Sequence, residues 1–596
     1  MLRQLKGSDF RWAYLGEDVA KAITIEQQLK GTGQRIEIAE ELQKVAHSLR
    51  QPYIEYIGKL SLQNNSILWW VGSLSEKNPW ISKTFLYACY IRLCQNLLNS
   101  SGQETLVFFG ENKALRKCLV KNASASHKGE ILHLESLTHT IFEALRKTLG
   151  IVLYKGYFVL SGIYRLLLAR YYKLNQIPGG KIAEGNGLVF LHNWVDQRSF
   201  DTNGEYSDSY FGELAHHLKN KGGNVIIVPY ILHTVSYRQT LKKMRRSSEN
   251  FLVPESFWKI SDIFRILVKT TANVPAKRAY PTFEGMEISE PIYDDLRREW
   301  AGIRTASSLL HYEVVKHWKN ARIPIDTFIY TYENHVWEKA YCMAFREFYP
   351  STKIIGYQHA TVPKMLLFYF FSQDELPLLP FPDKVITNGR YIERLFKESG
   401  YAPEKVVCGG AIRYEGMKKE RKVAIKKGTS NPVILVTPSI DKNESIELIQ
   451  KVLAAFGQTD KYKIILKFHP VIPYPSIAKD LGILPEHFII SDKPVSELLK
   501  ESQVLLYTSS ATSIEALSVG VPVLHIESDF TIDRDDLSDF SPSIRKSAKS
   551  KDDIIRMTEE ILKTDEKELS KQRVIWEDMV SEIFGPVDER VFDLFS

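Results

Sequence analysis

The chain has 596 residues, of which 44% are hydrophobic and 25% charged, and this ordinary globular balance excludes a disordered, collagen-like or coiled-coil protein. Single cores stop growing near roughly 250–300 residues, so at least two domains are expected. Lys and Arg total 78 against 71 Asp and Glu, and the resulting charge of +7 suits an anionic substrate or a membrane surface but gives no reason to expect nucleic acid.

Fourteen short apolar runs predict β-strands, and helix-length segments separate most of them. Such runs of four to eight residues, alternating with helices, are typical of parallel sheets that are covered on both faces. The predicted fold class is therefore α/β, with more than one doubly wound parallel sheet. An extra N-terminal α/β subdomain and a helical insertion are expected besides. The predicted strands lie in residues 10–16, 66–74, 105–112, 187–195, 224–232, 327–334, 353–359, 384–389, 405–410, 432–439, 463–470, 488–492, 504–510 and 522–526.

The domain boundaries follow from interruptions of this pattern. The proline-rich stretch 372–383 is the main break and predicts the start of a new lobe at residue 384. The last segment is expected to form terminal helices that pack back across the cleft. The predicted units are an α/β subdomain at 1–150, one lobe at 151–383 with a helical insertion near 235–325, a second lobe at 384–565 and terminal helices at 566–596.

One apolar segment, 151–172, raises the question of a membrane. Lys155, Arg165 and Arg170 interrupt it, whereas a span needs about 20 largely uncharged residues. A buried or inter-domain helix is the favoured interpretation, with an interfacial helix second and a true span third. The N-terminus lacks the apolar core of a signal peptide. Five cysteines without a CxxC pair give no disulfide framework and no zinc site, so a cytoplasmic protein without a bound metal is expected.

Two clusters near the carboxyl ends of predicted strands could bind phosphate. The run KIILKFHP ends with Lys467, His469 and Pro470, and an imidazole at this edge could donate to a phosphate oxygen. The alternative is a histidine that is held by a backbone carbonyl.

The second cluster is a Ser/Thr-rich turn after VLLY. Ser509, Ser510 and Thr512 offer hydroxyl groups there, and the spacing of Thr512 and Glu515 predicts a capping box for the following helix. Exposed amides and hydroxyls at such a turn can hold an anion. The alternative is a capped helix that binds nothing.

These residues carry a resemblance. His469–Pro470, Ser509–Ser510 and the following IEALSVGVPV resemble the donor domain of GT-B glycosyltransferases, over residues 385–530. They are most similar to bacterial sialyltransferases and capsular Kdo transferases, which use CMP-activated acidic sugars. The resemblance implies a GT-B-like fold, in which two Rossmann-like, doubly wound parallel-sheet lobes face a cleft. It makes 384–565 the nucleotide-sugar-binding lobe and 151–383 the acceptor-side lobe. It also implies that His469, Ser509 and Ser510 hold the nucleotide phosphate and that Glu515 binds the ribose hydroxyls.

A third cluster, within 329–363, lies at two further strand ends. Glu333 and Asn334 leave one run and Gln358 and His359 leave the next, so all four are expected at one rim. Glu333 is a candidate base, and the other three are candidates for substrate binding. The ENxxWE and GYQH patterns, with WWVGSLSEKNP and WVDQRSF, resemble a family of bacterial surface-carbohydrate biosynthesis proteins thought to be glycosyltransferases.

A fourth cluster follows GLVFLHN. Asp196 lies nearest the strand end and is the first candidate for the carboxylate that deprotonates an acceptor hydroxyl. Arg198 could hold an acidic sugar or position Asp196 through a bidentate pair. The alternative is a surface turn with helix-capping acids.

The predicted function is a glycosyltransferase of bacterial surface-polysaccharide assembly. It transfers a sugar from a nucleotide donor, with a CMP-sugar favoured, to a glycan or lipid-linked acceptor, and it needs no further cofactor. Contact with the inner face of the membrane is a further option, because basic residues at 242–246 and the apolar run 365–371 accompany the segment 151–172. The alternatives are a CDP-glycerol-type phosphotransferase, a sugar-nucleotide epimerase and a non-catalytic scaffold of a polysaccharide synthase.

Overall fold

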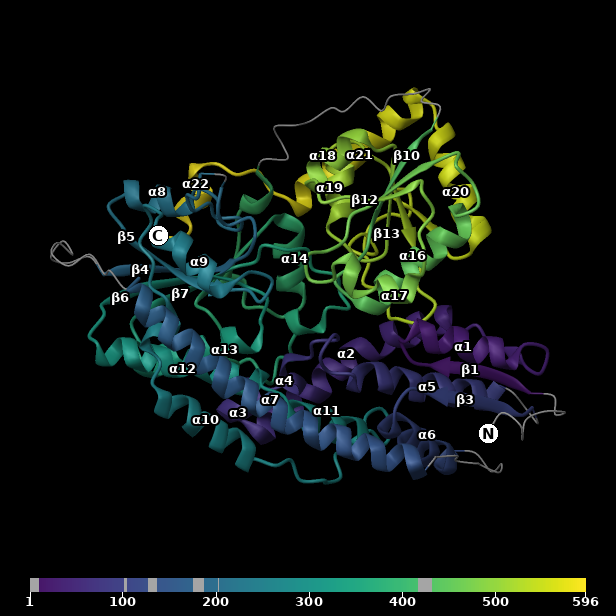
Figure 1. The fold of residues 1–596 in the computed structure, drawn as a ribbon, viewed down its shortest axis with the longest axis horizontal. Helices are drawn as coiled ribbons and strands as arrows, with labels where there is room; N and C mark the ends of the chain where they lie inside the picture. Colours follow the sequence, from purple (N-terminus) through teal and green to yellow (C-terminus); the bar gives the residue numbers. More distant parts are fainter. Residues whose placement is uncertain (1–9, 101–103, 127–136, 175–186, 202, 416–430) are drawn as a thin grey trace.

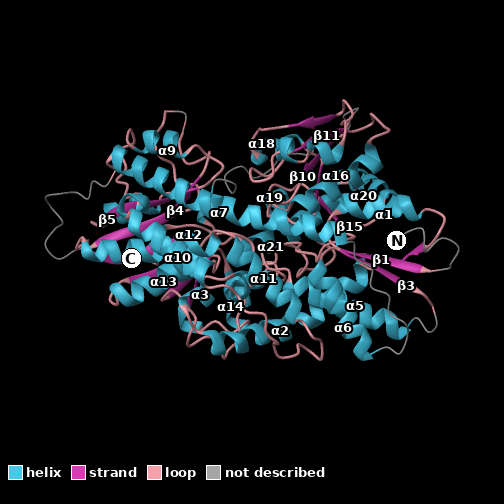
Figure 2. Cartoon of the chain, turned by 60° about the horizontal axis from the view of Figure 1, so that its bottom comes forward, coloured by secondary structure: helices cyan, strands magenta, loops and turns pink. Residues whose placement is uncertain are grey.

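The computed structural model describes residues 10–100, 104–126, 137–174, 187–201, 203–415 and 431–596. Two six-stranded parallel sheets form two lobes, and a third sheet of three parallel strands lies near the N-terminus (Figure 1). Helices cover the sheets, as the secondary-structure colouring shows (Figure 2). The predicted fold class of two doubly wound lobes with an additional N-terminal α/β subdomain is confirmed.

The first lobe has the strand order β5-β4-β6-β7-β8-β9. Alternate residues of its strands enter two different cores, because successive side chains of a strand point to opposite faces. One face packs on α10, α12 and α13, and the other on α8 and the C-terminal residues. The strands are β4 (Leu188–Val195), β5 (Asn224–Ile231), β6 (Ile325–Thr331), β7 (Lys353–Tyr357), β8 (Lys384–Thr387) and β9 (Val406–Cys408). The helices are α8 (Leu214–Asn220), α9 (Tyr237–Met244), α10 (Ile260–Ala272), α11 (Ser289–Ala301), α12 (Arg304–Asn320), α13 (Val336–Phe348) and α14 (Arg390–Glu398).

The predicted lobe boundary at residue 383 is wrong. Strand β8 pairs with β7, and β9 pairs with β8, so both strands complete the first sheet. The proline-rich stretch 372–383 joins two neighbouring strands of one sheet, and the chain changes lobe between β9 and β10. Proline marks an irregular connection, but it does not distinguish a loop within a domain from a linker between domains.

The second lobe has the strand order β12-β11-β10-β13-β14-β15. Its strands are β10 (Val433–Thr437), β11 (Lys463–Leu466), β12 (Phe488–Ile490), β13 (Val504–Tyr507), β14 (Val523–Ile526) and β15 (Lys546–Ala548). Its helices are α16 (Lys442–Phe456), α17 (Ala478–Leu481), α18 (Val495–Glu501), α19 (Thr512–Ser518) and α20 (Lys551–Lys563).

The N-terminal sheet has the order β2-β1-β3 and lies between two layers. Trp12 and Tyr14 of β1 pack into the core of the second lobe, whereas Ala13 and Leu15 face the helices of the subdomain. The subdomain is therefore attached to the second lobe by one face of its sheet. Its elements are β1 (Arg11–Leu15), α1 (Val19–Leu29), β2 (Gln34–Arg35), α2 (Ala39–Asn64), α3 (Ile67–Trp70), α4 (Ser73–Glu76), α5 (Thr84–Ser100), β3 (Leu106–Gly110) and α6 (Lys113–Ser126).

The strand predicted at 66–74 is wrong, because this segment forms the short helices α3 and α4. Ser66 caps α3 by accepting the backbone N–H of Trp69 through its hydroxyl oxygen, at 3.3 Å. An apolar run of this length does not distinguish the two, because short buried helices and strands have the same hydrophobic content.

The C-terminal segment returns from the second lobe to the first. Helix α21 (Glu566–Ile583) packs on α19 of the second lobe and on α14 of the first, and α22 (Glu589–Asp593) packs on α8. Between the two helices, the N–H of Gly585 donates to the carbonyl oxygen of Asn388 at 2.8 Å. The end of the chain thus joins the two lobes.

We expect Gly389→Ala to lower the apparent melting temperature. A Cβ atom at Gly389 would lie 2.5 Å from the carbonyl oxygens of Glu582 and Ile583, so the returning backbone must shift. Overpacking of this kind costs about 1–3 kcal/mol. Gly156→Ala is the matched control, because nothing lies within 4 Å of a Cβ atom there, and it should leave the melting temperature unchanged or raise it. Equal melting temperatures of the two variants would contradict the prediction.

Candidate active site between the two lobes

The strand order reverses once in each six-stranded sheet, and the candidate residues lie at those points. The reversal falls between β4 and β6 in the first sheet and between β10 and β13 in the second. Ligands of open α/β sheets bind in the crevice at such switch points, beyond the carboxyl ends of the strands. The residues that follow these and the adjacent strands are Asp196 after β4, Glu333 after β6, His359 after β7, Arg413 after β9, His469 after β11 and Ser509 after β13.

The guanidinium of Arg413 interacts electrostatically with carboxylates of both lobes. Burial acts to lower the pKa of its guanidinium, but surrounding groups raise it, and these include Glu333 of the first lobe and Glu515 of the second. Within the described part of the chain, no carboxylate oxygen lies within 4.0 Å of this guanidinium. Arg413 therefore offers a half-buried positive charge that is shared between the lobes but paired with neither carboxylate.

Glu333 is held by a chain of buried charges. His335 Nε2 lies 2.7 Å from a carboxylate oxygen of Glu333, and His335 Nδ1 lies 2.8 Å from Glu76 of α4. Burial alone would lower the pKa of His335, but these two hydrogen bonds raise it to about 10. Burial acts to raise the pKa of Glu333, and the hydrogen bond and charge of His335 outweigh it, so the pKa is lowered. At neutral pH the pair is a carboxylate and an imidazolium.

Asn334, predicted to bind substrate, instead shapes this turn. Its φ is 60°, in the left-handed region, and its amide donates to the carbonyl oxygen of Phe368 at 2.6 Å. The backbone N–H groups of Glu333, Asn334 and His335 all donate to Glu338, which caps α13. The side chain of Asn334 is buried, and its amide group is committed to the protein.

His359 lies beside Glu333, as predicted, whereas Gln358 does not line the site. The amide of Gln358 donates to the carbonyl oxygen of Ala360, and the side chain is fully buried. His359 Nδ1 lies 3.3 Å from the guanidinium of Arg413, and its Nε2 lies 3.6 Å from Glu333. Burial lowers the pKa of His359 to about 4, so the ring is neutral and orients Arg413 rather than carrying charge.

Asp196 and Arg198 form the predicted pair. The guanidinium of Arg198 donates to one oxygen of Asp196 at 3.1 Å and 2.6 Å, and the backbone N–H of Arg198 donates to the other oxygen at 2.8 Å. Both oxygens of the carboxylate are therefore occupied. Arg198 also contacts the hydroxyl of Tyr210, whose ring lies beneath the guanidinium of Arg413.

His469 lies in the second lobe and faces these arginines. Its Nδ1 accepts the backbone N–H of Val471 at 3.2 Å, so the proton of the neutral ring is on Nε2. Burial, together with the charges of Arg413 and Arg198, lowers the pKa of His469 to about 4. The two other residues of this motif point elsewhere: Lys467 donates to the carbonyl oxygen of Asp492, and Pro470 is exposed.

The hydroxyl groups of the Ser/Thr-rich turn form hydrogen bonds within the protein, which the sequence does not predict. The hydroxyl of Ser509 donates to Glu444 at 2.6 Å, and the hydroxyl of Ser510 donates to Thr512 at 2.9 Å. The predicted capping box of Thr512 and Glu515 is wrong. Helix α19 is capped at Ala511 without a side-chain hydrogen bond. Glu515 is thereby free to face Arg413: burial raises its pKa, against the opposing charges of Arg413 and Arg198.

Three charged residues of this region were missed. Arg413 follows the predicted strand 405–410, so its place at a strand end was an available signal. Glu76 and Glu444 gave none, because each is defined by partners far away in the sequence. Glu76 binds Arg304 and His335, and Glu444 binds Ser509 and Arg534.

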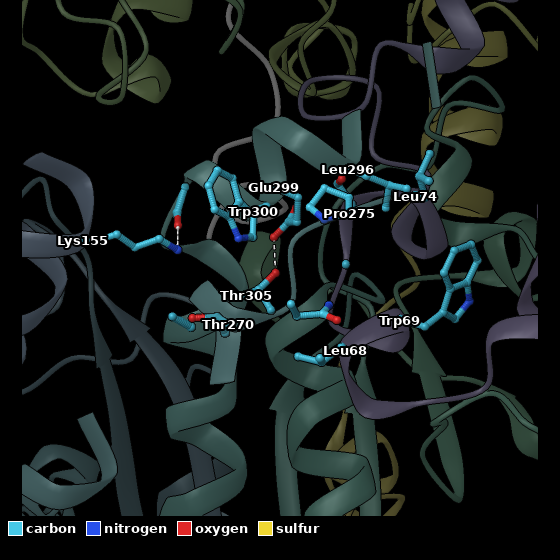
Figure 3. Close-up of a pocket in the computed structure, with 15 residues that line it drawn as sticks. Leu68, Trp69, Leu74, Lys155, Thr270, Pro275, Leu296, Glu299, Trp300 and Thr305 are labelled. Carbon is cyan, nitrogen blue, oxygen red and sulfur yellow. Dashed lines mark hydrogen bonds between the residues drawn. The ribbon is translucent and has the colours of Figure 1, made fainter. Parts of the chain in front are cut away.

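A separate pocket lies outside this region. It has a volume of about 90 Å³ and lies against α3 and α10, with Lys155 at one side (Figure 3). Its polar groups bind one another or the backbone: Lys155 donates to the carbonyl oxygen of Gly302, and Thr305 donates to Glu299. Among the described residues that line this pocket there is no histidine or arginine of the kind found between the lobes.

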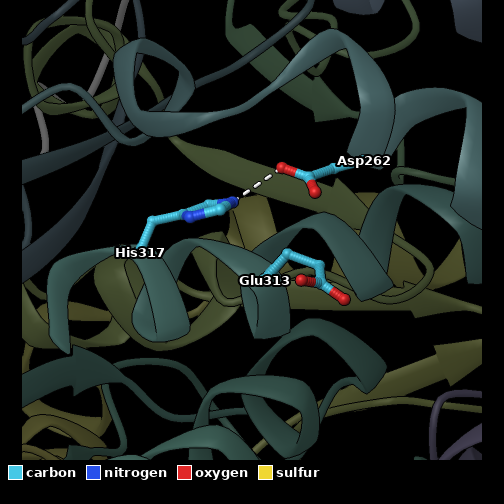
Figure 4. Close-up of side chains that lie close together, drawn as sticks. All are labelled: Asp262, Glu313 and His317. Carbon is cyan, nitrogen blue, oxygen red and sulfur yellow. Dashed lines mark hydrogen bonds and ion pairs between the residues drawn. The ribbon is translucent and has the colours of Figure 1, made fainter. Parts of the chain in front are cut away.

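Asp262, Glu313 and His317 bring three potential metal-ligand atoms within 4.8 Å of one another (Figure 4). His317 Nε2 lies 2.7 Å from Asp262, and the guanidinium of Arg265 lies 2.7 Å from Asp262 and 2.8 Å from Glu313. Arg265 supplies the positive charge that a cation would bring, so this set fits an ion-pair network better than a metal site.

Comparisons with known proteins gave structural neighbours only. No family model and no curated protein matches the sequence. A glycosyltransferase from Rickettsia africae is similar over 68% of this chain and 96% of its own, with 12% identity and a TM-score of 0.37. A UDP-GlcNAc 2-epimerase from Neisseria meningitidis is similar over 68% of this chain and 97% of its own, with 11% identity and a TM-score of 0.38. The glycotransferase of kitacinnamycin is similar over 69% of this chain and 98% of its own, with 12% identity and a TM-score of 0.40. All TM-scores lie below 0.5, so the functional argument rests on the side chains of this chain.

We expect the buried imidazolium to make stability depend on pH. The pKa of His335 is raised from its ordinary value of 6.5 to about 10, so its contribution is complete below pH 6.5 and is lost as the pH rises toward 10. One such group lowers the free energy of unfolding by at most about 1.4 kcal/mol per pH unit in this range. Melting curves between pH 6 and pH 9.5 should therefore fall more steeply for the parent than for His335→Gln. His47→Gln, on the exposed side of α2, should follow the parent, and parallel curves for all three proteins would contradict the assignment.

Proposed function

We propose that this protein is a nucleotide-sugar-dependent glycosyltransferase. The observation that carries the proposal is the unpaired guanidinium of Arg413 between Glu333 of one lobe and Glu515 of the other. A positive charge at the switch points of two facing sheets suits a ligand with a phosphate group, because buried arginines recognise phosphate through several donors at once.

The donor phosphate would be bound by neutral and cationic donors. His469 Nε2 carries a proton and has no hydrogen-bond partner within the described residues, so it is free to donate to a phosphate oxygen. Arg413 would balance the charge that develops when the phosphate leaves, and donors that are fixed in advance are the main source of such stabilisation. This arrangement needs no divalent metal.

A CMP-activated acidic sugar is the proposed donor. The resemblance of the His-Pro and Ser-Ser motifs to sialyl- and Kdo transferases supports it, and so does the second guanidinium, Arg198, which could hold the sugar carboxylate. The hydroxyl of Ser509 is already used by Glu444, so we assign to Ser509 the positioning of the turn. Glu515 is the proposed partner of the ribose hydroxyls.

Glu333 is the proposed base. It would take the proton of an acceptor hydroxyl while that oxygen bonds to the anomeric carbon, and the bond from that carbon to the phosphate oxygen would break with its electron pair leaving on CMP. Asp196 is the weaker candidate, because both of its oxygens are engaged by Arg198. Arg198 would have to release Asp196 before that carboxylate could accept a proton.

The proposed setting is bacterial surface-polysaccharide assembly on the cytoplasmic side, with a glycan or lipid-linked acceptor. The resemblance of the ENxxWE and GYQH patterns supports this setting. Gln358 and Asn334 bind within the protein, so we propose that they maintain the acceptor rim rather than contact the acceptor.

The first test is nucleotide binding by thermal shift. CMP should raise the apparent melting temperature without magnesium, because a ligand of the folded state alone stabilises it by mass action. His469→Ala should weaken the apparent affinity roughly ten- to hundredfold, the equivalent of about 1.5–3 kcal/mol for a hydrogen bond to a charged group. His233→Ala, at an exposed position, is the control. Equal affinity of His469→Ala and the parent would exclude the assigned role.

A preference for UDP or CDP over CMP in the same titration would replace the CMP-sugar proposal. Product analysis would then separate an epimerase, whose product forms without an acceptor, from a phosphotransferase, whose product carries the phosphate. Binding without turnover on any acceptor would favour a scaffold.

The second test separates the two carboxylates. Glu333→Gln should lower kcat by about 10²–10⁴-fold, the usual contribution of a general base, whereas Asp196→Asn should lower it by less than about tenfold. The measurement is CMP release from a CMP-sugar in the presence of acceptor. A larger loss in Asp196→Asn than in Glu333→Gln would reverse the assignment.

A further inference from the structure

Helix α7 (Leu137–Tyr172) presents a row of large apolar side chains to the outside. Helix α10 lies against it, with Ile263 packed on Gly162, and adds further exposed apolar side chains. Contiguous exposed patches of this kind mark interaction sites. We call the set the outer apolar face; its members are Leu149, Val152, Leu153, Tyr154, Tyr157, Leu160, Tyr164, Leu167 and Tyr171 of α7, Ile260, Phe264 and Val268 of α10, and Val274 beyond it.

The opposite side of α7 is fixed to the first lobe. Phe158 and Leu166 are buried there, and all three interrupting cations bind residues of the lobe, although Arg170 itself stays exposed. Lys155 donates to the carbonyl oxygen of Gly302 at 3.0 Å, Arg170 donates to that of Trp258 at 2.7 Å, and Arg165 lies 3.4 Å from Glu255. The outer apolar face is thereby left nearly free of charge.

The segment Leu149–Tyr172 is long and apolar enough to cross a membrane, and only 17% of an 18-residue window within it is buried in the protein. A crossing would carry the three cations and the lobe that binds them into hydrocarbon, where unpaired charge is costly. A helix that packs on a lobe with one face and exposes an apolar face on the other side is instead suited to lie parallel to the membrane, within its interface.

The surroundings of the outer apolar face are basic. Helix α9 packs on α7 and exposes Arg238, Lys242 and Lys243, and α10 exposes Lys269. Neither α9 nor the segment Leu149–Tyr172 contains an acidic residue, and the single acid of α10, Asp262, is buried. Basic residues next to an apolar face complement a surface of anionic lipid, at roughly 1 kcal/mol for each residue near the surface.

We propose that the outer apolar face docks in the plane of a lipid bilayer with anionic headgroups. The tyrosines of α7 suit this position, because aromatic rings with a polar end are enriched at membrane–water interfaces. A second copy of the chain is disfavoured as the occupant, because a twofold contact would bring the same basic groups together. The run 365–371, which the sequence placed with this surface, is buried in the core and takes no part. The inference does not rest on the proposed chemistry.

The test is co-sedimentation of the purified full chain with vesicles of phosphatidylcholine alone or with added phosphatidylglycerol. We expect binding to the anionic vesicles that weakens with salt. Leu160→Glu combined with Leu167→Glu should lower the partition coefficient about tenfold or more, since both side chains are exposed and the substitution places charge on the apolar face. Lys242→Glu with Lys269→Glu should lower binding to anionic vesicles and not to neutral ones. Ile483→Glu with Val574→Glu, at exposed apolar positions of the second lobe and α21, is the matched control and should bind as the parent does.

Several results would overturn this proposal. Equal binding of the Leu160/Leu167 variant and the parent would exclude the face, and so would absence of binding to both kinds of vesicle. A dimer of the parent that the same variant dissociates would assign the face to a second copy. If the chain stays in the membrane fraction of expressing cells after extraction with alkaline carbonate, α7 is a true membrane span. The melting curve of each variant without nucleotide shows whether it is folded. Nucleotide binding is then measured separately, so failure of membrane binding is distinguished from failure of the proposed chemistry.

Discussion

A buried carboxylate in the N-terminal subdomain underlies the geometry of the site. Glu76 is fully buried in α4 and is balanced by Arg304 and His335, and His335 in turn holds Glu333. Ions are tolerated inside proteins only when they are paired, so removal of one member leaves the others uncompensated. The rim of the first lobe therefore depends on a helix that precedes this lobe by more than a hundred residues. The N-terminal subdomain therefore helps to position the side chains of the candidate site.

The two lobes contribute groups of different character. The first lobe supplies both arginines, Arg198 and Arg413, with Glu333. The second supplies the neutral His469, the Ser/Thr-rich turn and a single carboxylate that faces Arg413, Glu515. His469 and His359 both stay neutral at physiological pH, because burial lowers the pKa of each to about 4. A neutral imidazole donates a hydrogen bond without adding charge, so the net charge of the site is set by its arginines, its carboxylates and the imidazolium of His335.

Thirteen of the fourteen predicted strands exist, because buried parallel strands leave a clear record of apolar runs. The exception, 66–74, packs as short helices whose composition is the same. The positions of the strand ends could also be predicted from the sequence. Site residues at these ends are Asp196, Glu333, His359 and His469, each of which follows an apolar run. What the sequence did not reveal depends on long-range pairing. The engagement of Asn334, Gln358 and Ser509, the role of Glu76 and the extent of the first sheet all follow from contacts between distant segments, and local patterns carry no information about these.

The return of the chain to the first lobe bears on the order in which the protein is made. Val591, Phe592 and Phe595 complete the core on one face of the first sheet, against Tyr357 and Ile386. Residues 591–595 are synthesised after every strand of this sheet, so the first lobe emerges from the ribosome with one side of its sheet uncovered. The N-terminal strand β1 likewise meets its core partners only when the second lobe has formed. A nascent chain must keep both apolar surfaces from other contacts until the second lobe and the segment 591–595 have been made, so the two lobes cannot complete their cores one after the other.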